Sequence, residues 1–477
     1  MAANEKKQTS GTENRKPDRE IALDIIMGVM EQGEFSHILL RKTFEHHKYL
    51  EKNRRKFITR LAEGTIEKTV TLDYILNRYS KIRVDKMKPL IRNILRMSLY
   101  QLKFLSGVPE SAVCNEAVKL TRKRGFQNLS GFVNGILRNI LRAPELAVIP
   151  DGASETSVSG LSAAYSMPEW LVKHFLDSYG IELTRNILKG TQEAAEDTWT
   201  TVRVNTSKIG LEQAEEMLWQ EGVEVQRILL AQGALRIRGY DMLASLSVFR
   251  QGMIQVQNVS SILAAQTAGV RPGSVCMDIC AAPGGKTLHL ADLLQGTGSV
   301  ISRDISEKKC SLIRENMERA GFRNIKVQVW NALDFDESAV ESADLVMADI
   351  PCSGLGVLAA KPDIKYRLRP EQLQELAELS QNILNHAVKY IKNGGILLFS
   401  TCTVNPGENT RIRQWLIEEQ GLVPEDIRPV LSEELLSMGN NRMTAADGYL
   451  QLFPSKETDG FFISRFRKTK KVQDNGY

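Results

Sequence analysis

The stretch Asp278–Thr287, DICAAPGGKT, decides the fold, because it takes the chain from an apolar run through a glycine-bearing turn into a helix. Beyond it, strand-like runs alternate with helical periodicity, most clearly in the helices expected over Glu307–Ala320 and Pro370–Ile391. Such alternation predicts a parallel sheet with helices on both faces, an α/β fold. Ligands bind these sheets at the carboxyl ends of the strands. We therefore expect a site beside this turn.

Two of the six cysteines follow apolar runs that we expect to form the fourth and fifth strands of this sheet. Cys352 comes after Leu345–Ala348, in ADIPCSG, and Cys402 comes after Ile396–Phe399, in STCTVNPGE. An inert cysteine is more often buried within an element, so positions at strand ends indicate chemistry. A redox disulfide is the other interpretation, and the lack of CxxC spacing disfavours it.

The glycine-bearing turn has three candidate ligands, and a purely structural turn is the fourth explanation. The dinucleotide fingerprint G-x-G-x-x-G is absent. Gly285, Lys286 and Thr287 fit the end of a phosphate-binding P-loop, but Cys280 stands where the first glycine of that motif belongs. The third candidate is S-adenosylmethionine (AdoMet), whose amino-acid portion can approach a glycine-permitted backbone at a helix N-terminus.

The AdoMet interpretation gives two further residues a role. Asp304 ends the second expected strand and would accept hydrogen bonds from both ribose hydroxyls, as an acidic residue does in nucleotide-binding sheets. Asn331 follows the third strand and would face the adenine. The predicted cofactor site thus spans three successive strand ends.

Composition describes a globular protein of several domains. The 477 residues are 42% hydrophobic and 25% charged, and no apolar run approaches the length of a membrane span. The polar start is not a signal peptide, and the cysteines lack metal-site spacing, so we expect reduced thiols in a cytoplasmic protein without a membrane or metal partner. The six histidines form no recognisable ligand cluster, and we take the protein to be a monomer.

The charge is concentrated at the start of the chain. Residues 1–145 carry a net charge of +12 and the remainder carries −7. A basic segment on a mildly acidic body suggests a polyanion-binding module, although solvated basic helix faces explain the charge equally well.

The remaining periodicity divides the chain into domains. Apolar residues three and four apart predict an all-α domain, and a stretch rich in small and turn-forming residues predicts a linker. A small α+β unit follows before the α/β domain. The predicted boundaries are a tail over 1–16, the helical domain over 17–145, the linker over 146–162, the α+β subdomain over 163–270 and the catalytic domain over 271–470.

Three motifs in order, CAAPGGKT, ADIPCSGLG and STCTVNPGEN, resemble those of AdoMet-dependent RNA cytosine-C5 methyltransferases. FVNGILRNI in the helical domain, KPDIKYR and TDGFFISRF narrow the resemblance to the RsmB/Sun (Fmu) branch, whose members modify 16S rRNA. The resemblance covers roughly Pro17 to Lys468. It implies a NusB-like N-terminal domain, AdoMet as cofactor and small-subunit ribosomal RNA as partner.

The family pattern also implies residue roles. Cys402 of the Thr-Cys motif is the nucleophile, Cys352 assists product release, Asp349 contacts the base, and Lys286 steadies Asp349. Analogy with DNA cytosine methyltransferases would choose Cys352 as nucleophile instead, but a chain with both motifs follows the RNA pattern. The implied cofactor residues are Cys280, Ala281, Ala282, Pro283, Gly284, Gly285, Lys286, Asp304, Asn331 and Asp349.

Asn331 stands where the family usually has an aspartate, which leaves its adenine contact open. Candidate RNA contacts are basic or amide residues of the first two domains: Arg54, Arg55, Lys123, Arg124, Arg203 and Asn205. Two rivals remain: a methyltransferase acting on transfer RNA, and an RNA-binding ribosome assembly factor whose catalytic site is dead. The presence of Lys286, Asp349 and both thiols disfavours the second.

Overall fold

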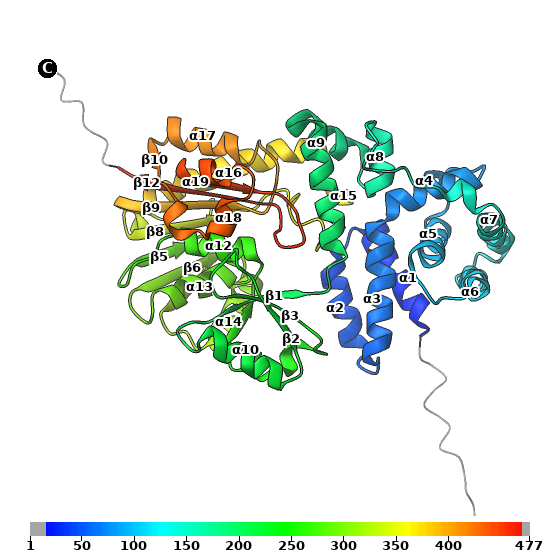
Figure 1. Cartoon of the computed structure of the whole chain (residues 1–477), viewed down its shortest axis with the longest axis horizontal. Helices are drawn as coiled ribbons and strands as arrows, with labels where there is room; N and C mark the ends of the chain where they lie inside the picture. The colour runs from blue at the N-terminus through cyan, green and yellow to red at the C-terminus, as the bar shows by residue number, and fades with distance from the viewer. Residues whose placement is uncertain (1–15, 470–477) are drawn as a thin grey trace, which may run out of the picture. The chain divides into compact units, whose positions relative to one another are not determined.

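The computed structural model describes residues 16–469, and the tail expected at the start of the chain lies almost wholly outside them. The chain forms two compact units, one made by the residues up to Arg185 with Lys361–Arg367, the other by Asn186–Ala360 with the residues from Leu368 onward. Each is described by itself (Figure 1).

The first unit is all-α, as predicted. Its helices are α1 (Asp18–Gln32), α2 (Ser36–His46), α3 (Lys52–Glu67), α4 (Thr69–Tyr79), α5 (Pro89–Phe104), α6 (Glu110–Lys123), α7 (Ser130–Arg142), α8 (Val158–Tyr165), the first part of α9 (Glu169–Ala195) and the short α15 (Ile364–Arg367). In α7 the buried residues Val133, Ile136, Leu137 and Ile140 recur three and four apart, which gives the helix one apolar face. Such faces meet in a single core shared by α1 to α7.

A segment from far along the chain, Lys361–Arg367, belongs to this helical unit. Lys365 Nζ donates to the carbonyls of Glu67 at 2.8 Å and Ser166 at 2.7 Å. Ser36 Oγ donates to the buried carboxylate of Asp363 at 2.6 Å. Burial lowers the pKa of Lys365 to about 8. The KPDIKYR motif is thus part of the helical unit, although it follows the Pro-Cys motif in the chain.

The second unit contains two sheets. The smaller is antiparallel with strand order β2-β3-β1-β4, formed by β1 (Thr200–Val204), β2 (Glu224–Arg227), β3 (Ala234–Arg238) and β4 (Ile254–Val256). Together with α10 (Leu211–Gln220) and the short α11 (Ser247–Arg250), it has its own apolar core. The sequence predicts a small α+β subdomain in this part of the chain, over 163–270, but residues 163–185 lie in the helical unit instead.

The larger sheet has eight strands in the order β10-β12-β9-β8-β5-β6-β7, with β11 paired to β12 (Figure 1). Its strands are β5 (Val275–Asp278), β6 (Ser299–Asp304), β7 (Ile325–Val329), β8 (Ala343–Asp349), β9 (Ile391–Thr401), β10 (Leu422–Pro424), β11 (Tyr449–Leu452) and β12 (Phe461–Lys468). The five strands from β5 to β9 are parallel, and β12 runs antiparallel to β9. Cys352 and Cys402 therefore follow the fourth and fifth strands, as predicted.

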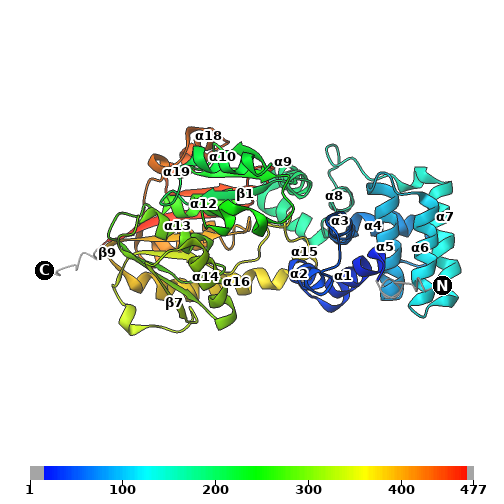
Figure 2. The same cartoon turned by 90° about the horizontal axis from the view of Figure 1, so that it is seen from below.

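Helices cover both faces of this sheet (Figure 2). The helices are α12 (Val259–Thr267), α13 (Gly285–Leu293), α14 (Glu307–Ala320), α16 (Pro370–Tyr390), α17 (Thr410–Glu418), α18 (Glu433–Leu436) and α19 (Asn441–Ala446). Along β8, Leu345 and Met347 pack in one core with α12 and α13, whereas Val346 and Ala348 pack in another with α16 and α17. Alternate side chains of a strand point to opposite faces, so both faces must be apolar.

Candidate active site

Four polar strand ends meet at one edge of the large sheet. β5 ends at Asp278, β6 at Asp304, β8 at Asp349 and β9 at Thr401. Because these strands are parallel, their carboxyl ends share one edge, where ligands bind in this class of fold. The edge therefore collects the carboxylates and thiols that the sequence singles out.

The two thiols meet because their strands are neighbours in register. Asp349 of β8 lies opposite Ser400 of β9, so the loops that follow the strands start side by side. The Sγ atoms of Cys352 and Cys402 are 3.4 Å apart, within the range of a sulfur hydrogen bond. Both side chains are half-buried. Their hydrogen bond and burial together raise the pKa of Cys352 well above its ordinary value.

An ion pair lies at the same edge. Lys286 Nζ donates to Asp349 Oδ2 at 2.7 Å, and Ser400 Oγ donates to Asp349 Oδ1 at 2.7 Å. Burial alone would lower the pKa of Lys286, but the carboxylates of Asp349 and Asp278 and, less strongly, a charge on Cys402 outweigh it and raise that pKa. Lys286 therefore stays cationic, and its charge favours a thiolate at Cys402. Ser400 was not singled out from the sequence; it directly precedes the Thr-Cys dipeptide.

The cofactor loop turns into α13 through a tightly packed glycine. Gly284 has φ = 103°, a conformation that favours glycine, and a Cβ added there would lie 3.2 Å from side-chain atoms of Ile313 and Leu288. Asp304 Oδ2 accepts a hydrogen bond from Ala282 N at 2.8 Å, which ties the end of β6 to this loop. The same carboxylate accepts from Ile305 N at 2.8 Å.

A buried carboxylate at the end of β5 supports a cationic ligand here. Asp278 accepts from Thr287 Oγ1 at 2.6 Å through Oδ2, while its buried Oδ1 has no hydrogen-bond partner among the described residues. Burial raises the pKa of Asp278 to about 7. The turn between β5 and α13 contains Cys280, Ala281, Ala282, Pro283 and Gly284, and Gly285 is the first residue of α13. A carboxylate oxygen without a partner, beside a glycine turn, fits the positively charged amino-acid end of AdoMet. The position of Asp278 directly before that turn is the feature of the sequence that could have identified it.

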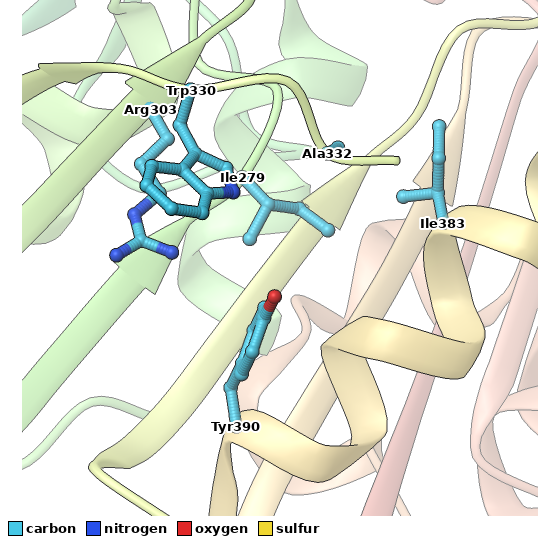
Figure 3. Close-up of a pocket in the computed structure, with 6 residues that line it drawn as sticks. All are labelled: Ile279, Arg303, Trp330, Ala332, Ile383 and Tyr390. Atoms are coloured by element: carbon cyan, nitrogen blue, oxygen red, sulfur yellow. The ribbon is translucent and has the colours of Figure 1, made fainter. Parts of the chain in front are cut away.

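A small pocket borders the loop that carries Asn331. Its lining comprises Ile279, Arg303, Trp330, Ala332, Ile383 and Tyr390 (Figure 3). The Arg303 guanidinium lies 5.0 Å from the centre of the Trp330 ring. Asn331 itself accepts a hydrogen bond from Leu333 N at 3.2 Å, so its side chain shapes the loop. The predicted adenine contact of Asn331 stays a proposal.

Two predicted RNA contacts must be corrected. Arg203 is 1% exposed, and its guanidinium forms an ion pair with Asp292 of α13 at 2.8 Å. Asn205 is fully buried and donates to the carbonyl of Gly252. Neither side chain lies on a surface that RNA could contact. They hold the small sheet together and tie it to α13.

The other predicted RNA contacts lie in the helical unit, where three pair with acidic residues and Arg55 bonds a backbone carbonyl. Arg54 forms an ion pair with Asp18 at 2.6 Å, and Arg55 donates to the carbonyl of Leu50. Lys123 pairs with Glu20 at 2.6 Å, yet its side chain is 59% exposed. Arg124 pairs with Asp24 and with Glu20. An RNA role for these four residues stays a proposal.

Metal-binding clusters and membrane-spanning helices are absent from the described part of the chain. Between residues 16 and 469, no three His, Cys, Asp or Glu side chains are grouped so that they could hold a metal ion. In the same part of the chain, no helix combines the length and apolar character that a membrane crossing needs.

Three family models match consecutive parts of the chain. The NusB family matches residues 16–142, the ferredoxin-like domain of RsmF/B-like methyltransferases matches 167–241, and 16S rRNA methyltransferase RsmB/F matches 265–467. The probable ribosomal RNA small subunit methyltransferase B of Bacillus subtilis is 34% identical over 94% of this chain and 98% of its own length. Its counterpart in Synechocystis is 29% identical over 94% of this chain and 99% of its own.

Solved structures show the same fold. One aligns over 95% of this chain and 99% of its own length with a TM-score of 0.76 at 24% identity. A methyltransferase homolog protein from Pyrococcus horikoshii covers 66% of this chain and 99% of its own, with a TM-score of 0.54 and 26% identity. Motifs, domain order and full-length similarity agree, and the chain belongs to the RsmB/F family of 16S rRNA methyltransferases.

Proposed function

We propose that this protein methylates carbon 5 of a cytosine in small-subunit ribosomal RNA, through a covalent bond between Cys402 and C6 of the base. The observation that carries the proposal is the pair of thiols, Sγ to Sγ 3.4 Å, at the strand edge that also bears the Lys286–Asp349 ion pair and the cofactor loop. AdoMet, the cofactor of this family, supplies an electrophilic methyl group.

The chemistry requires a nucleophile because C5 of cytosine is too weakly nucleophilic to take the methyl group unaided. The Cys402 thiolate adds to C6, which turns the ring into an enamine with electron density at C5. C5 then takes the methyl group. Lys286 supports this step because its retained positive charge favours the thiolate form of Cys402.

Asp349 is the group that we expect to hold the base. Its carboxylate is fixed from both sides, by Lys286 at 2.7 Å and Ser400 at 2.7 Å, so it needs no rearrangement to meet a base at this edge. As the thiolate adds to C6, N3 takes up a proton from solvent, and its N–H would then donate to this carboxylate and stabilise the charge that develops on the ring. The cytosine must be unpaired or flipped out to reach Cys402.

Release completes the cycle and gives Cys352 its role. The C5 proton leaves to a base, its electron pair restores the C5–C6 double bond, and the bond between C6 and Cys402 Sγ breaks. Cys352 lies 3.4 Å from that sulfur. Once the adduct has formed and Cys352 has lost its proton to solvent, its thiolate is suitably placed to accept the C5 proton. Loss of Cys352 should therefore trap the adduct.

Ribosomal RNA is the favoured substrate because the full-length relatives carry that activity in their names and a basic NusB-type domain precedes the catalytic part. Transfer RNA is the alternative substrate, and a catalytically dead assembly factor is the alternative class. We place the activity in the cytoplasm, in a monomer.

The test is methyl transfer from labelled AdoMet to protein-free small-subunit rRNA, followed on denaturing gels that retain protein–RNA adducts. We expect Cys402→Ala to be inactive without an adduct and Cys352→Ala to accumulate one. Cys114→Ala, which removes a buried thiol of the helical unit, is the matched control. If Cys352→Ala is inactive and Cys402→Ala accumulates the adduct, the roles of the two cysteines are reversed. Transfer to tRNA alone would overturn the choice of substrate. No transfer to any RNA would favour the assembly factor.

A further inference from the structure

Glu408 places a buried carboxylate between the two cysteine loops. The side chain is 0% exposed, in the loop that follows β9 and Cys402. Its Oε2 accepts from the backbone N–H of Ser353 at 2.8 Å, and its Oε1 accepts from Asn405 Nδ2 at 2.9 Å. Ser353 directly follows Cys352, so Glu408 joins the Cys402 loop to the backbone that carries the other thiol.

Neutral hydrogen bonds join the same two loops and do not need a charge. Ser353 Oγ and Thr403 Oγ1 are 2.7 Å apart, and Gly356 N donates to the carbonyl of Cys402 at 3.0 Å. A carboxylate is costly to bury, and burial raises the pKa of Glu408. Because neutral hydrogen bonds already join the two cysteine loops, the negative charge of Glu408 is not needed to hold them together, and this points to a role for the charge itself.

The charges that act on the two sulfurs differ in sign. The hydrogen bond to Cys402, burial and, less strongly, the carboxylate of Glu408 all disfavour the thiolate of Cys352. Lys286, held by Asp349 on the other strand end, interacts with the charge of Cys402. Two thiols within hydrogen-bond distance share one proton most readily when one of them is the better thiolate.

We propose that Glu408 is a positioning residue that keeps Cys352 protonated, so that Cys402 alone ionises and attacks. It acts through the Ser353 amide and through its charge, and it need touch neither base nor cofactor. The proposal rests on the proposed function, because it explains how two adjacent thiols take different roles. In this arrangement the Cys352 S–H donates to the Cys402 thiolate, and no bond other than S–H is made or broken.

The test is the pH dependence of thiol alkylation, measured on the full chain without RNA. Wild type and Glu408→Gln are treated with iodoacetamide across pH, and modification of each cysteine is read by mass spectrometry. Glutamine keeps the shape and removes the charge. We expect the Cys352 midpoint to move to lower pH by about one unit, so that its alkylation below the midpoint rises about tenfold.

Controls separate charge from folding. Glu315→Gln removes an exposed carboxylate of α14 and should leave both profiles unchanged. If Glu408→Gln does not fold, Asn405→Ala replaces it, since loss of the 2.9 Å bond favours protonated Glu408 and must shift the Cys352 midpoint in the same direction. An unchanged Cys352 midpoint, or an equal shift at Cys402, would overturn the proposal.

Failure here and failure of the proposed function remain distinguishable. Alkylation requires no RNA, whereas methyl transfer by wild type tests the function directly. Normal transfer with an unmoved Cys352 midpoint in Glu408→Gln rejects the role of Glu408 alone. Absent transfer by wild type rejects the function whatever the alkylation profile shows.

Discussion

The sulfur atoms of Cys352 and Cys402 lie 3.4 Å apart, although the residues are 50 positions apart in the chain. The contact follows from the parallel pairing of β8 and β9, which starts both loops at the same level of the sheet. Each thiol is therefore part of the other's environment. Substitution of one should change the chemistry of the other.

Removing Cys402 should make Cys352 easier to ionise. The hydrogen bond to Cys402 is the first cause of the raised pKa of Cys352, followed by burial. In Cys402→Ala we expect the pH midpoint of Cys352 alkylation to fall while remaining above that of a free thiol, because burial persists. Mass spectrometry after iodoacetamide treatment across pH measures it. A midpoint equal to that of wild type would show that the pair does not share a proton.

Lys286 and Asp349 should behave as one unit. Each neutralises the other at 2.7 Å in a half-buried site, so Lys286→Met or Asp349→Asn removes the same arrangement. We expect either change to reduce single-turnover methyl transfer by about 10² to 10³-fold, in the range of one lost electrostatic contact at a reacting centre. The double substitution should cost little more than either single one. Multiplied losses in the double variant would show that the two residues act separately.

Gly356 should not tolerate a side chain. A Cβ at this position would lie 1.8 Å from the carbonyl oxygen of Gly460. That backbone cannot easily move aside, because Gly460 N donates to the carbonyl of Gly356 at 2.9 Å. We expect Gly356→Ala to destabilise the catalytic unit by about 1–3 kcal/mol in thermal unfolding and to slow adduct release, because the loop also carries Cys352. Gly407→Ala is the matched control in the Cys402 loop, since its Cβ would meet no atom closer than 3.4 Å. Equal effects of the two changes would contradict this account.

The sequence predicts this site well where local pattern and strand order suffice. Alternating strands and helices place Cys352 and Cys402 at the ends of adjacent strands, and that is where they lie. Glu408 escaped notice because its importance depends on the Ser353 amide, 55 positions away. A local sequence pattern does not indicate which residues far apart in the chain will be in contact.

The same limit explains the wrong expectation for Arg203. In TVRVN an arginine between valines resembles a solvent-facing position of a half-buried strand. Its partner Asp292 lies 89 positions further on, and their ion pair makes burial tolerable. Likewise, nothing in KPDIKYR indicates that Lys365 reaches the carbonyls of Glu67 and Ser166 in the helical unit.

Arg203 should therefore matter for stability and not for RNA affinity. Arg203→Met leaves Asp292 buried with only the hydroxyl and amide donors of Thr206 and Ser207, so we expect a loss of about 3 kcal/mol in unfolding free energy. RNA binding by the folded variant should keep the wild-type salt dependence. Lys123→Ala, which removes a 59% exposed cation, should instead weaken binding and reduce the salt slope by up to about one. A reduced slope in Arg203→Met alone would restore its RNA role.

Asp278 should make the stability of the catalytic unit depend on pH in an unusual direction. Its pKa rises from 3.8 to about 7 on folding, mainly because the carboxyl is buried at the end of β5. Between these two pH values the folded state binds more protons than the unfolded state. The contribution of Asp278 to the free energy of unfolding is therefore fully present below about pH 4 and is lost as pH rises through about 7. Most carboxylates that are paired on folding act in the opposite sense.

Calorimetric unfolding between pH 5 and pH 8 checks the sign. Asp278→Asn cannot ionise and can still accept from Thr287 Oγ1, so its unfolding temperature should decline less than that of wild type over this interval. Glu315→Gln, at an exposed position of α14, should follow the wild-type curve. If Asp278→Asn instead tracks wild type, the carboxyl is already ionised near pH 5. Its orphaned oxygen would then be a standing negative charge at the cofactor loop, and AdoMet binding would not depend on pH through this residue.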